Sequence, residues 1–153
     1  MTNVAPQHSF ERLDRRMAHH VAVGALIGPK GVLLAHRRSD LRYYPDCWDF
    51  PGGHIEDGET PAMALVRELS EEIGVTALVE GEAGLRILQD AESAEGLVLD
   101  LWAIFDWVGS VANHAPEEHD DVRWFDLAAV QSVQLAHPMY RDFIAGLLSP
   151  GHR

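Results

Sequence analysis

Three glutamates, Glu68, Glu71 and Glu72, stand close together in the segment GHIEDGETPAMALVRELSEEIGV, residues 53–75. On a helix, successive residues are rotated by about 100°, so these side chains fill an arc beside an apolar stripe. Carboxylates packed this closely repel one another. A hard divalent cation such as Mg²⁺ or Mn²⁺ removes that repulsion, because it takes oxygen ligands and often shares them with substrate phosphates. The pattern therefore indicates a metal site for phosphate chemistry.

A plain acidic helix face is the alternative, with Arg67 paired to Glu71 one turn later. The residues at fixed distances around the glutamates separate the two interpretations. They are Gly53, Glu59 and the run Arg67-Glu68-Leu69-x-Glu71-Glu72-x-Gly74-Val75. On ordinary residue frequencies, this arrangement arises by accident with odds below about one in ten million. It therefore favours the functional interpretation.

This segment resembles the Nudix box, the signature of hydrolases that act on a nucleoside diphosphate linked to another group. All fixed positions of the box are present. The preceding residues 48–53, WDFPGG, are similar to the strand and turn that lead into the box in MutT-like members. The resemblance implies an α/β fold, a Nudix-like α/β/α sandwich with a mixed β-sheet. It also implies a hydrolase that depends on Mg²⁺, with Mn²⁺ as a substitute.

The resemblance assigns roles within the box. It implies that Glu68 and Glu72 hold the metal ions, that Glu71 assists, and that one of these three glutamates is the general base. It does not select which one. A backbone carbonyl of the Gly52-Gly53 turn is the expected additional ligand, since a side chain there would block the close approach.

Two further charged positions belong to the expected site. Arg67 is expected to be one of the catalytic residues. The alternative is a structural role, because a guanidinium can hold the carboxylate of Glu59 in a bidentate geometry. MutT-like members bring another metal-binding glutamate from the loop before the penultimate strand. Glu118 fits that position, six residues before Trp124. The alternative is that residues 117–121 form a plain solvated acidic loop.

Five residues are candidates for substrate binding. Arg37 and Arg38 end an apolar strand near the expected site, and either one can hold a terminal phosphate, although arginine at a strand end is commonplace. His54 stands where many relatives have lysine, so its contribution would depend on pH. His137 and Tyr140 begin the last helix, where relatives place side chains that contact the base. The alternative role for His137 is a helix cap.

The elements that must position these residues follow from local patterns. Thr60-Pro61 predicts a helix start and Gly74 its end, so the box helix spans about 60–73. A helical turn is predicted at 127–130 and a last helix from His137-Pro138 to about Leu148. Polar loops are predicted at 37–47 and 110–121. Strands are predicted at 20–27, 32–36, 48–50, 75–80, 84–89, 97–108 and 122–125, and the run 97–108 is expected to be central because it is apolar on both faces.

Composition limits the classes of function. The 153 residues predict a single Nudix domain over 18–150 after a partly flexible lead-in at 1–17. A net charge of −12, from 12 basic and 24 acidic residues, argues against a nucleic-acid polymer as partner but allows a metal-bridged nucleotide. The single cysteine excludes an internal disulfide. We find no signal peptide or membrane span, so we expect a cytoplasmic protein, either a monomer or a homodimer.

The absence of two residues that mark other members of the family limits the choice of substrate. ADP-ribose-type members carry a proline, and dinucleoside polyphosphate members a tyrosine, shortly after the box, and Gln89–Ser93 offers neither. The sequence therefore favours a (deoxy)nucleoside triphosphate pyrophosphohydrolase that releases monophosphate and pyrophosphate. A hydrolase of nucleoside diphosphate sugars or other NDP-X compounds is the alternative. A non-catalytic nucleotide sensor is disfavoured, because the box is intact and no helix-turn-helix pattern is visible.

Overall fold

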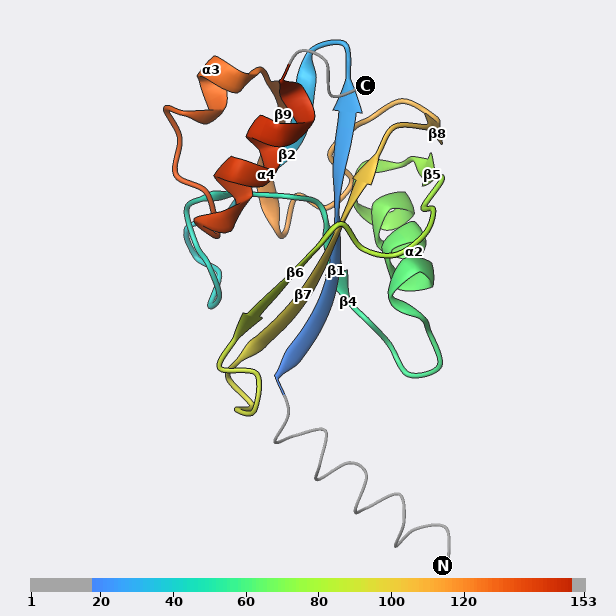
Figure 1. The fold of residues 1–153 in the computed structure, drawn as a ribbon, viewed down its shortest axis with the longest axis vertical. Helices are drawn as coiled ribbons and strands as arrows, with labels where there is room; N and C mark the ends of the chain where they lie inside the picture. Colours follow the sequence, from blue (N-terminus) through green and yellow to red (C-terminus); the bar gives the residue numbers. More distant parts are fainter. Residues whose placement is uncertain (1–17, 150–153) are drawn as a thin grey trace, which may run out of the picture.

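The computed structural model of the protein describes residues 18–149, so the lead-in predicted at 1–17 lies outside the described residues. A seven-stranded mixed sheet carries one helix on one face and two on the other (Figure 1). The helices are α2 (Pro61–Ile73), α3 (Leu127–Val130) and α4 (Met139–Leu148). This arrangement confirms the predicted α/β/α sandwich with a mixed sheet.

The strands of this sheet are β1 (His19–Gly28), β2 (Gly31–Arg37), β3 (Trp48–Asp49), β4 (Gly52–His54), β6 (Leu85–Gln89), β7 (Leu97–Ile104) and β9 (His119–Phe125). β1 runs parallel to β7 over most of its length. Its other edge is shared, because β2 pairs with the end of β1 through Ile27↔Val32 and β4 pairs with its start through Val21↔His54. β2 then diverges from β1 to pair with β9 and β3, which opens the sheet between β2 and β4.

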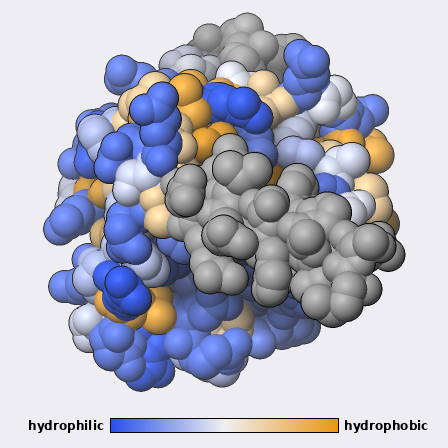
Figure 2. Space-filling view, turned by 90° about the horizontal axis from the view of Figure 1, so that it is seen from below, coloured by the Kyte–Doolittle hydropathy of each residue, from blue (hydrophilic) through white to orange (hydrophobic). Residues whose placement is uncertain are grey.

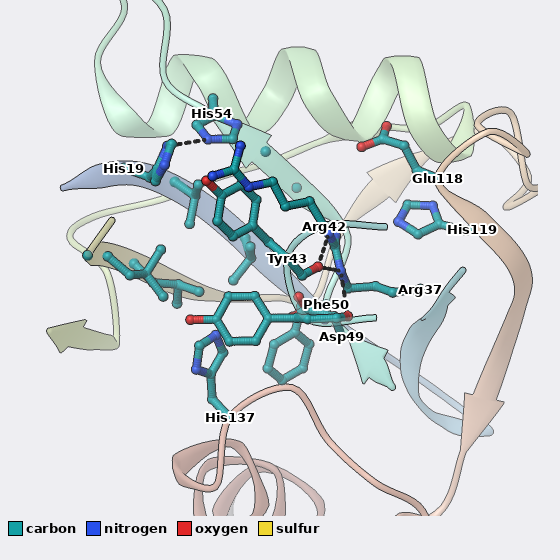
Figure 3. Close-up of a pocket in the computed structure, with 18 of the residues that line it drawn as sticks. His19, Arg37, Arg42, Tyr43, Asp49, Phe50, His54, Glu118, His119 and His137 are labelled. Carbon is teal, nitrogen blue, oxygen red and sulfur yellow. Dashed lines mark hydrogen bonds between the residues drawn. The ribbon is translucent and has the colours of Figure 1, made fainter. Parts of the chain in front are cut away.

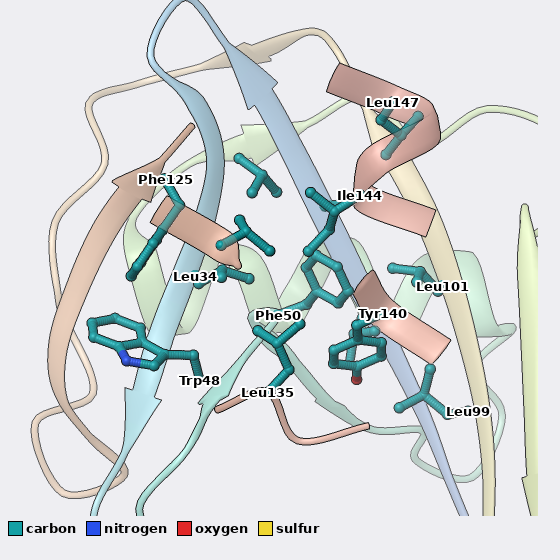
Figure 4. Packing of buried hydrophobic residues seen from close by; sticks show 14 of the residues in the cluster. Leu34, Trp48, Phe50, Leu99, Leu101, Phe125, Leu135, Tyr140, Ile144 and Leu147 are labelled. Carbon is teal, nitrogen blue, oxygen red and sulfur yellow. The ribbon is translucent and has the colours of Figure 1, made fainter. Parts of the chain in front are cut away.

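Alternation along β1 explains why both faces of the sheet are covered. Val23, Ala25 and Ile27 face the cluster under α4, whereas Ala22 and Leu26 face the cluster under α2. Successive side chains of a strand point to opposite faces, so an unbroken apolar run requires cover on both sides. Figure 4 shows the first of these clusters, in which side chains of the sheet meet those of α4.

The box helix has the boundaries that its sequence predicts. The Oγ1 atom of Thr60 accepts a hydrogen bond of 3.1 Å from the backbone N–H of Met63, and Pro61 occupies the first turn. At the other end Gly74 has a φ of 74°, the left-handed conformation that glycine adopts without steric cost. Leu65, Leu69 and Ile73 are fully buried and anchor α2 on the sheet.

Most predicted strands shift by a residue at an end, and the glycine turn after Phe50 continues as the short strand β4, but the largest differences lie elsewhere. The apolar run 97–108 is broken after Ile104, and β8 (Trp107–Val108) leaves the main sheet to pair with β5 (Thr76–Ala77), which is shorter than the strand predicted at 75–80. Their pairing requires contacts distant in sequence, which local patterns do not reveal. β9 begins at His119, so part of the predicted acidic loop is a strand, because it pairs with the end of β2.

In the view of Figure 2, the described residues that can be seen are largely hydrophilic, with apolar side chains between them. Within residues 18–149, no helix has both the length and the apolar character needed to cross a membrane.

Candidate active site

A cavity of about 390 Å³ lies where β2 and β4 separate (Figure 3). Its volume falls in the range of small-molecule sites, roughly 300–1,000 Å³. β1, β4 and the segment before β7 supply its wall, and β9 and the start of the last helical segment supply side chains at two ends. The polar and aromatic side chains that line it are His19, Arg37, Arg42, Tyr43, Tyr44, Asp49, Phe50, His54, Glu95, Glu118, His119 and His137.

The glycine turn brings α2 against this cavity. The backbone N–H of Gly52 donates to Oε1 of Glu72 at 3.2 Å. A Cβ atom on Gly53 would lie 1.6 Å from Oε2 of Glu68, so the Glu68 carboxylate rests directly on the turn. Gly52 has a φ of 149°, and a Cβ there would lie 2.1 Å from the carbonyl oxygen of Ala22. Only glycine allows both close approaches.

Arg67 organises the acidic residues around the box. Its guanidinium forms a fork with the Glu59 carboxylate through bonds of 2.7 and 2.9 Å, and this hydrogen bonding lowers the pKa of Glu59 to about 2. It also donates to Glu68 at 2.9 Å and to Glu71 at 3.1 Å. The predicted bidentate Arg67–Glu59 pair is therefore present. The Arg67–Glu71 pair of the alternative interpretation is present too, within the same network.

The buried glutamates have strongly perturbed pKa values. Glu72 is 3% exposed, and its burial, followed by the charges of Glu68 and Glu118, raises its pKa to about 9. Burial, and then a hydrogen bond with Glu71, raises the pKa of Glu68 to about 7. Burial and the neighbouring carboxylates together outweigh the charge of Arg67 beside Glu68, so the ionised form of these groups is disfavoured in the free protein. The oxygen donors and the glycine turn thus fit a hard divalent cation.

In the free protein these side chains are occupied by other partners. Glu68 and Glu71 accept from Arg67, and Glu72 accepts from Gly52. Among residues 18–149, no three histidine, cysteine or acidic side chains already surround one point at metal-binding distances. Binding of a cation would require the glutamates to exchange these partners for the ion.

Glu118, the residue before β9, and His119, the first residue of β9, lie at the same end of the cavity (Figure 3). Glu118 lines the cavity, and burial raises its pKa. His119 is 3% exposed, with Nε2 4.0 Å from Oε1 of Glu72, and its Nδ1 has no hydrogen-bond partner in the described chain. Burial lowers its pKa to about 4, so this imidazole is neutral near pH 7. His119 was not among the site residues predicted from the sequence, although its position next to Glu118 was a usable signal.

His137 lies at the opposite end of the cavity from Glu118 (Figure 3). It is 2% exposed, its ring centroid lies 4.6 Å from that of Tyr44, and its Nδ1 has no partner among residues 18–149. Burial lowers its pKa, so the ring is neutral and offers both a donor and an acceptor. α4 has no side-chain cap, so His137 does not serve as one.

Two residues predicted to bind substrate, Tyr140 and Arg38, do not line the cavity. Tyr140 is fully buried, packs against Phe50 and does not line the cavity. Tyr140 lies in the first turn of α4, on the side of the helix that packs against the core. Arg38 also stays outside the cavity and forms an ion pair of 2.9 Å with Asp40. Adjacent residues of an extended chain point in opposite directions, so only one of Arg37 and Arg38 can face the site.

Arg37 and His54 do line the cavity. The Nε2 atom of His54 lies 3.2 Å from Nδ1 of His19. Burial, and then the charge of His19, lowers the pKa of His54. Besides His119, the polar and aromatic lining residues without a role predicted from the sequence are His19, Arg42, Tyr43, Tyr44, Asp49, Phe50 and Glu95. Of these, the buried-strand context of Asp49, between Trp48 and Phe50, was the clearest available signal.

Comparison with known families identifies the NUDIX domain over residues 18–147. The 8-oxo-dGTP diphosphatase of Proteus vulgaris is 41% identical over 56 residues, which cover 37% of this chain and 50% of that protein. The match thus spans half the length of that relative. The CTP pyrophosphohydrolase of Escherichia coli is 32% identical over 104 residues, 67% of this chain and 72% of the relative. The RNA pyrophosphohydrolase of Acidiphilium cryptum is 32% identical over 143 residues, 78% and 85% of the two chains.

Solved structures show the same fold. The solution structure of the E. coli ORF135 protein superposes with a TM-score of 0.69 at 26% identity, over 86% of this chain and 89% of that chain. The crystal structure of a MutT protein from Methanosarcina mazei also gives a TM-score of 0.69, at 21% identity, over 84% and 91%.

Proposed function

The chain belongs to the Nudix family of hydrolases and is MutT-like, and from this membership we propose that it cleaves (deoxy)nucleoside triphosphates to monophosphate and pyrophosphate. Its named relatives all act on phosphoanhydrides of nucleotides. One observation carries the proposal. The cavity is lined at one end by Glu118 and by the Gly52-Gly53 turn, against which the box glutamates Glu68 and Glu72 lie. At the other end it is lined by His137, whose Nδ1 atom has no partner among residues 18–149, so a metal-bound polyphosphate and a base can be held together.

The residues that would hold Mg²⁺ are the box glutamates Glu68 and Glu72, assisted by Glu71, with Glu118 from β9 and a carbonyl of the Gly52-Gly53 turn. When bound, the ions would neutralise charge on the phosphate oxygens as the bridging bond breaks. Arg67 keeps the glutamates in place through its fork with Glu59 and its bonds to Glu68 and Glu71.

One of the three box glutamates takes the proton from the attacking water. A carboxylate with a pKa raised toward neutrality is better matched to that task than one at its usual value. In the free protein Glu68 meets this condition with a pKa of about 7, whereas a pKa of about 9 keeps Glu72 protonated near pH 7 until a cation binds. Arg37 and His54 line the cavity near the glycine turn, where they can bind the phosphates.

The base would occupy the other end of the cavity. His137 presents Nδ1 without a partner, and the ring of Tyr44 lies against it. Asp49 lines the same region, and its Oδ1 atom is already held by Tyr140. A neutral imidazole and a carboxyl group are suited to hydrogen bonds with a base edge.

The names of the relatives differ in substrate, from 8-oxo-dGTP and CTP to RNA. The similarity to RNA pyrophosphohydrolases makes a triphosphorylated RNA end the second candidate. The net charge of −12 disfavours it, since binding of a polyanion depends on a basic surface.

The test is a substrate panel in Mg²⁺ that contains the common and 8-oxo nucleoside triphosphates, a nucleoside diphosphate sugar, ADP-ribose and a 5′-triphosphorylated RNA. We expect monophosphate and pyrophosphate from a triphosphate, with ¹⁸O from labelled water in only one product. Orthophosphate with a diphosphate product would contradict the proposed bond choice. Binding without any product would favour the sensor.

A further inference from the structure

Arg37 directs most of its hydrogen bonds at the backbone of one loop. Its Nε atom donates to the carbonyl oxygens of Tyr43 and Tyr44 at 3.2 and 3.1 Å, and its Nη2 atom donates to that of Tyr43 at 2.8 Å (Figure 3). The planar fork of a guanidinium suits two neighbouring carbonyls, whereas an ammonium group cannot reproduce it. Arg37 therefore fixes the Tyr43-Tyr44 peptide as well as lining the cavity.

The loop between β2 and β3 needs such a restraint, because its backbone is strained. Tyr44 has a φ of 51° and Asp46 a φ of 56°, values that residues with a side chain rarely adopt. Such conformations are energetically costly and persist only where surrounding contacts hold them. The carbonyl of Tyr44 is held by Arg37 and by the thiol of Cys47 at 3.2 Å. Loss of the guanidinium fork would leave the strained Tyr44 without its charged partner.

The same loop forms one wall of the base end. The Tyr44 ring lies 4.6 Å from the His137 ring, and its hydroxyl donates to Oε1 of Gln89 at 2.7 Å. Tyr43 lies 5.3 Å from His19 by ring centroids. Tyr43 is exposed, and Tyr44 is half-buried against the edge of the core cluster, so the backbone of the loop contributes to where both rings lie.

Arg37 also stands between the two ends of the cavity. Burial raises the pKa of Asp49 at the base end and of Glu118 at the metal end, and the charge of Arg37 partly offsets both. Its Nη1 atom takes no part in the hydrogen bonds to the Tyr43 and Tyr44 carbonyls, which use Nε and Nη2. One side chain can thus hold the loop and still face a phosphate.

We infer that Arg37 is a positioning residue for base selection, because its bonds to the Tyr43 and Tyr44 carbonyls hold the aromatic wall against His137. The inference rests on the proposed function. A residue that only binds phosphate would lower kcat/KM by the same factor for every base, since all triphosphates share that group. A residue that positions the wall changes the ranking among bases.

The decisive variants are Arg37→Gln and Arg37→Lys. The lysine keeps the positive charge for phosphate but loses the fork. We expect both variants to reduce the ratio of kcat/KM between the best and worst base by about tenfold, chiefly through KM. Arg38→Gln is the matched control, because Arg38 pairs with the exposed Asp40 and does not line the cavity. It should leave the ratio unchanged.

A double-mutant cycle tests whether Arg37 acts through Tyr44. If it does, the effects of Arg37→Lys and Tyr44→Ala on base ranking are non-additive, because the second change removes the ring that the first one misplaces. Additive effects would overturn the inference. So would a uniform loss across bases in Arg37→Lys, or a wild-type protein that does not distinguish bases.

Hydrogen exchange of residues 38–47 without nucleotide separates this inference from the proposed function. We expect faster exchange in Arg37→Lys and Arg37→Gln than in Arg38→Gln, since the Arg37 variants release the strained loop. Unchanged exchange would overturn the inference even if nucleotides are hydrolysed. Faster exchange in a protein that hydrolyses no nucleotide would instead reject the proposed function and leave the restraint by Arg37 established.

Discussion

The hydroxyl of Tyr140 donates a hydrogen bond of 2.7 Å to Oδ1 of Asp49, and the two residues lie 91 positions apart in the chain. The same oxygen accepts the backbone N–H of Phe50 at 2.8 Å. Burial raises the pKa of Asp49, whereas the bond from Tyr140 acts to lower it. Tyr140 therefore belongs to the core under α4 but influences a carboxyl group that lines the cavity.

Tyr140→Phe should destabilise the protein by about 1–3 kcal/mol, because it removes the partner of a buried carboxyl group while keeping the ring. It should also raise the pKa of Asp49 further. Urea unfolding at pH 7 measures the first effect. Tyr43→Phe is the control, since that hydroxyl is exposed and its bond to Glu95 is long, at 3.4 Å. Equal stability of Tyr140→Phe and wild type would mean that the bond contributes nothing to folding.

Glu72→Gln should reduce kcat by at least about a hundredfold, since it removes a ligand charge and keeps the side-chain volume. The fold should be retained, because the amide can still accept from the N–H of Gly52. Mn²⁺ binding, followed by calorimetry, should weaken in parallel. Glu80→Gln removes the same charge from an exposed glutamate outside the cavity and should change neither quantity. A Glu72→Gln protein with wild-type metal affinity would show that this assignment is wrong.

The stability of the metal-free protein should fall as the pH rises. The pKa of Glu72 is raised from 4.5 to about 9 and that of Glu68 from 4.5 to about 7, so the folded protein keeps protons that the unfolded chain has released. This contribution is complete below pH 4.5 and is lost as the pH rises toward about 9. In EDTA, Tm should therefore fall over this window, and Glu72→Gln should fall less steeply.

Excess Mg²⁺ should remove this loss, because the ion binds the deprotonated carboxylates and binds the folded protein more strongly. Calorimetry in buffers of different ionisation enthalpy should detect protons released on Mn²⁺ binding at pH 7. Metal binding without proton release would contradict the perturbed pKa values of the cluster.

His137→Ala should change the ranking among bases and raise KM with little effect on kcat, because a contact made equally in ground and transition states contributes to binding alone. Metal dependence should stay as in wild type. His137→Gln, which retains a donor and an acceptor, should recover part of the selectivity. An unchanged ranking accompanied only by a lower Tm would give His137 a purely structural role.

The sequence by itself determined the local features of this protein. Thr60, Pro61 and Gly74 set the limits of α2, because capping depends on residues within one turn. The unbroken apolar runs predicted strands covered on both faces. The box residues and their spacing predicted the family, which the comparisons confirm. The Arg67–Glu59 pair was also predictable, since a helix start and its first turns keep them close.

Only the tertiary structure decided which side chains meet in the cavity. It turned Arg37 toward the site and Arg38 away, buried Tyr140, and brought Asp49 and His137 to the same end. It also divided the run 97–108 into β7 and β8. These outcomes depend on how β2 diverges from β1 and on which face of α4 covers the sheet. Such pairings join residues far apart in the chain. Which side chains become buried is therefore decided only when the whole sheet has formed.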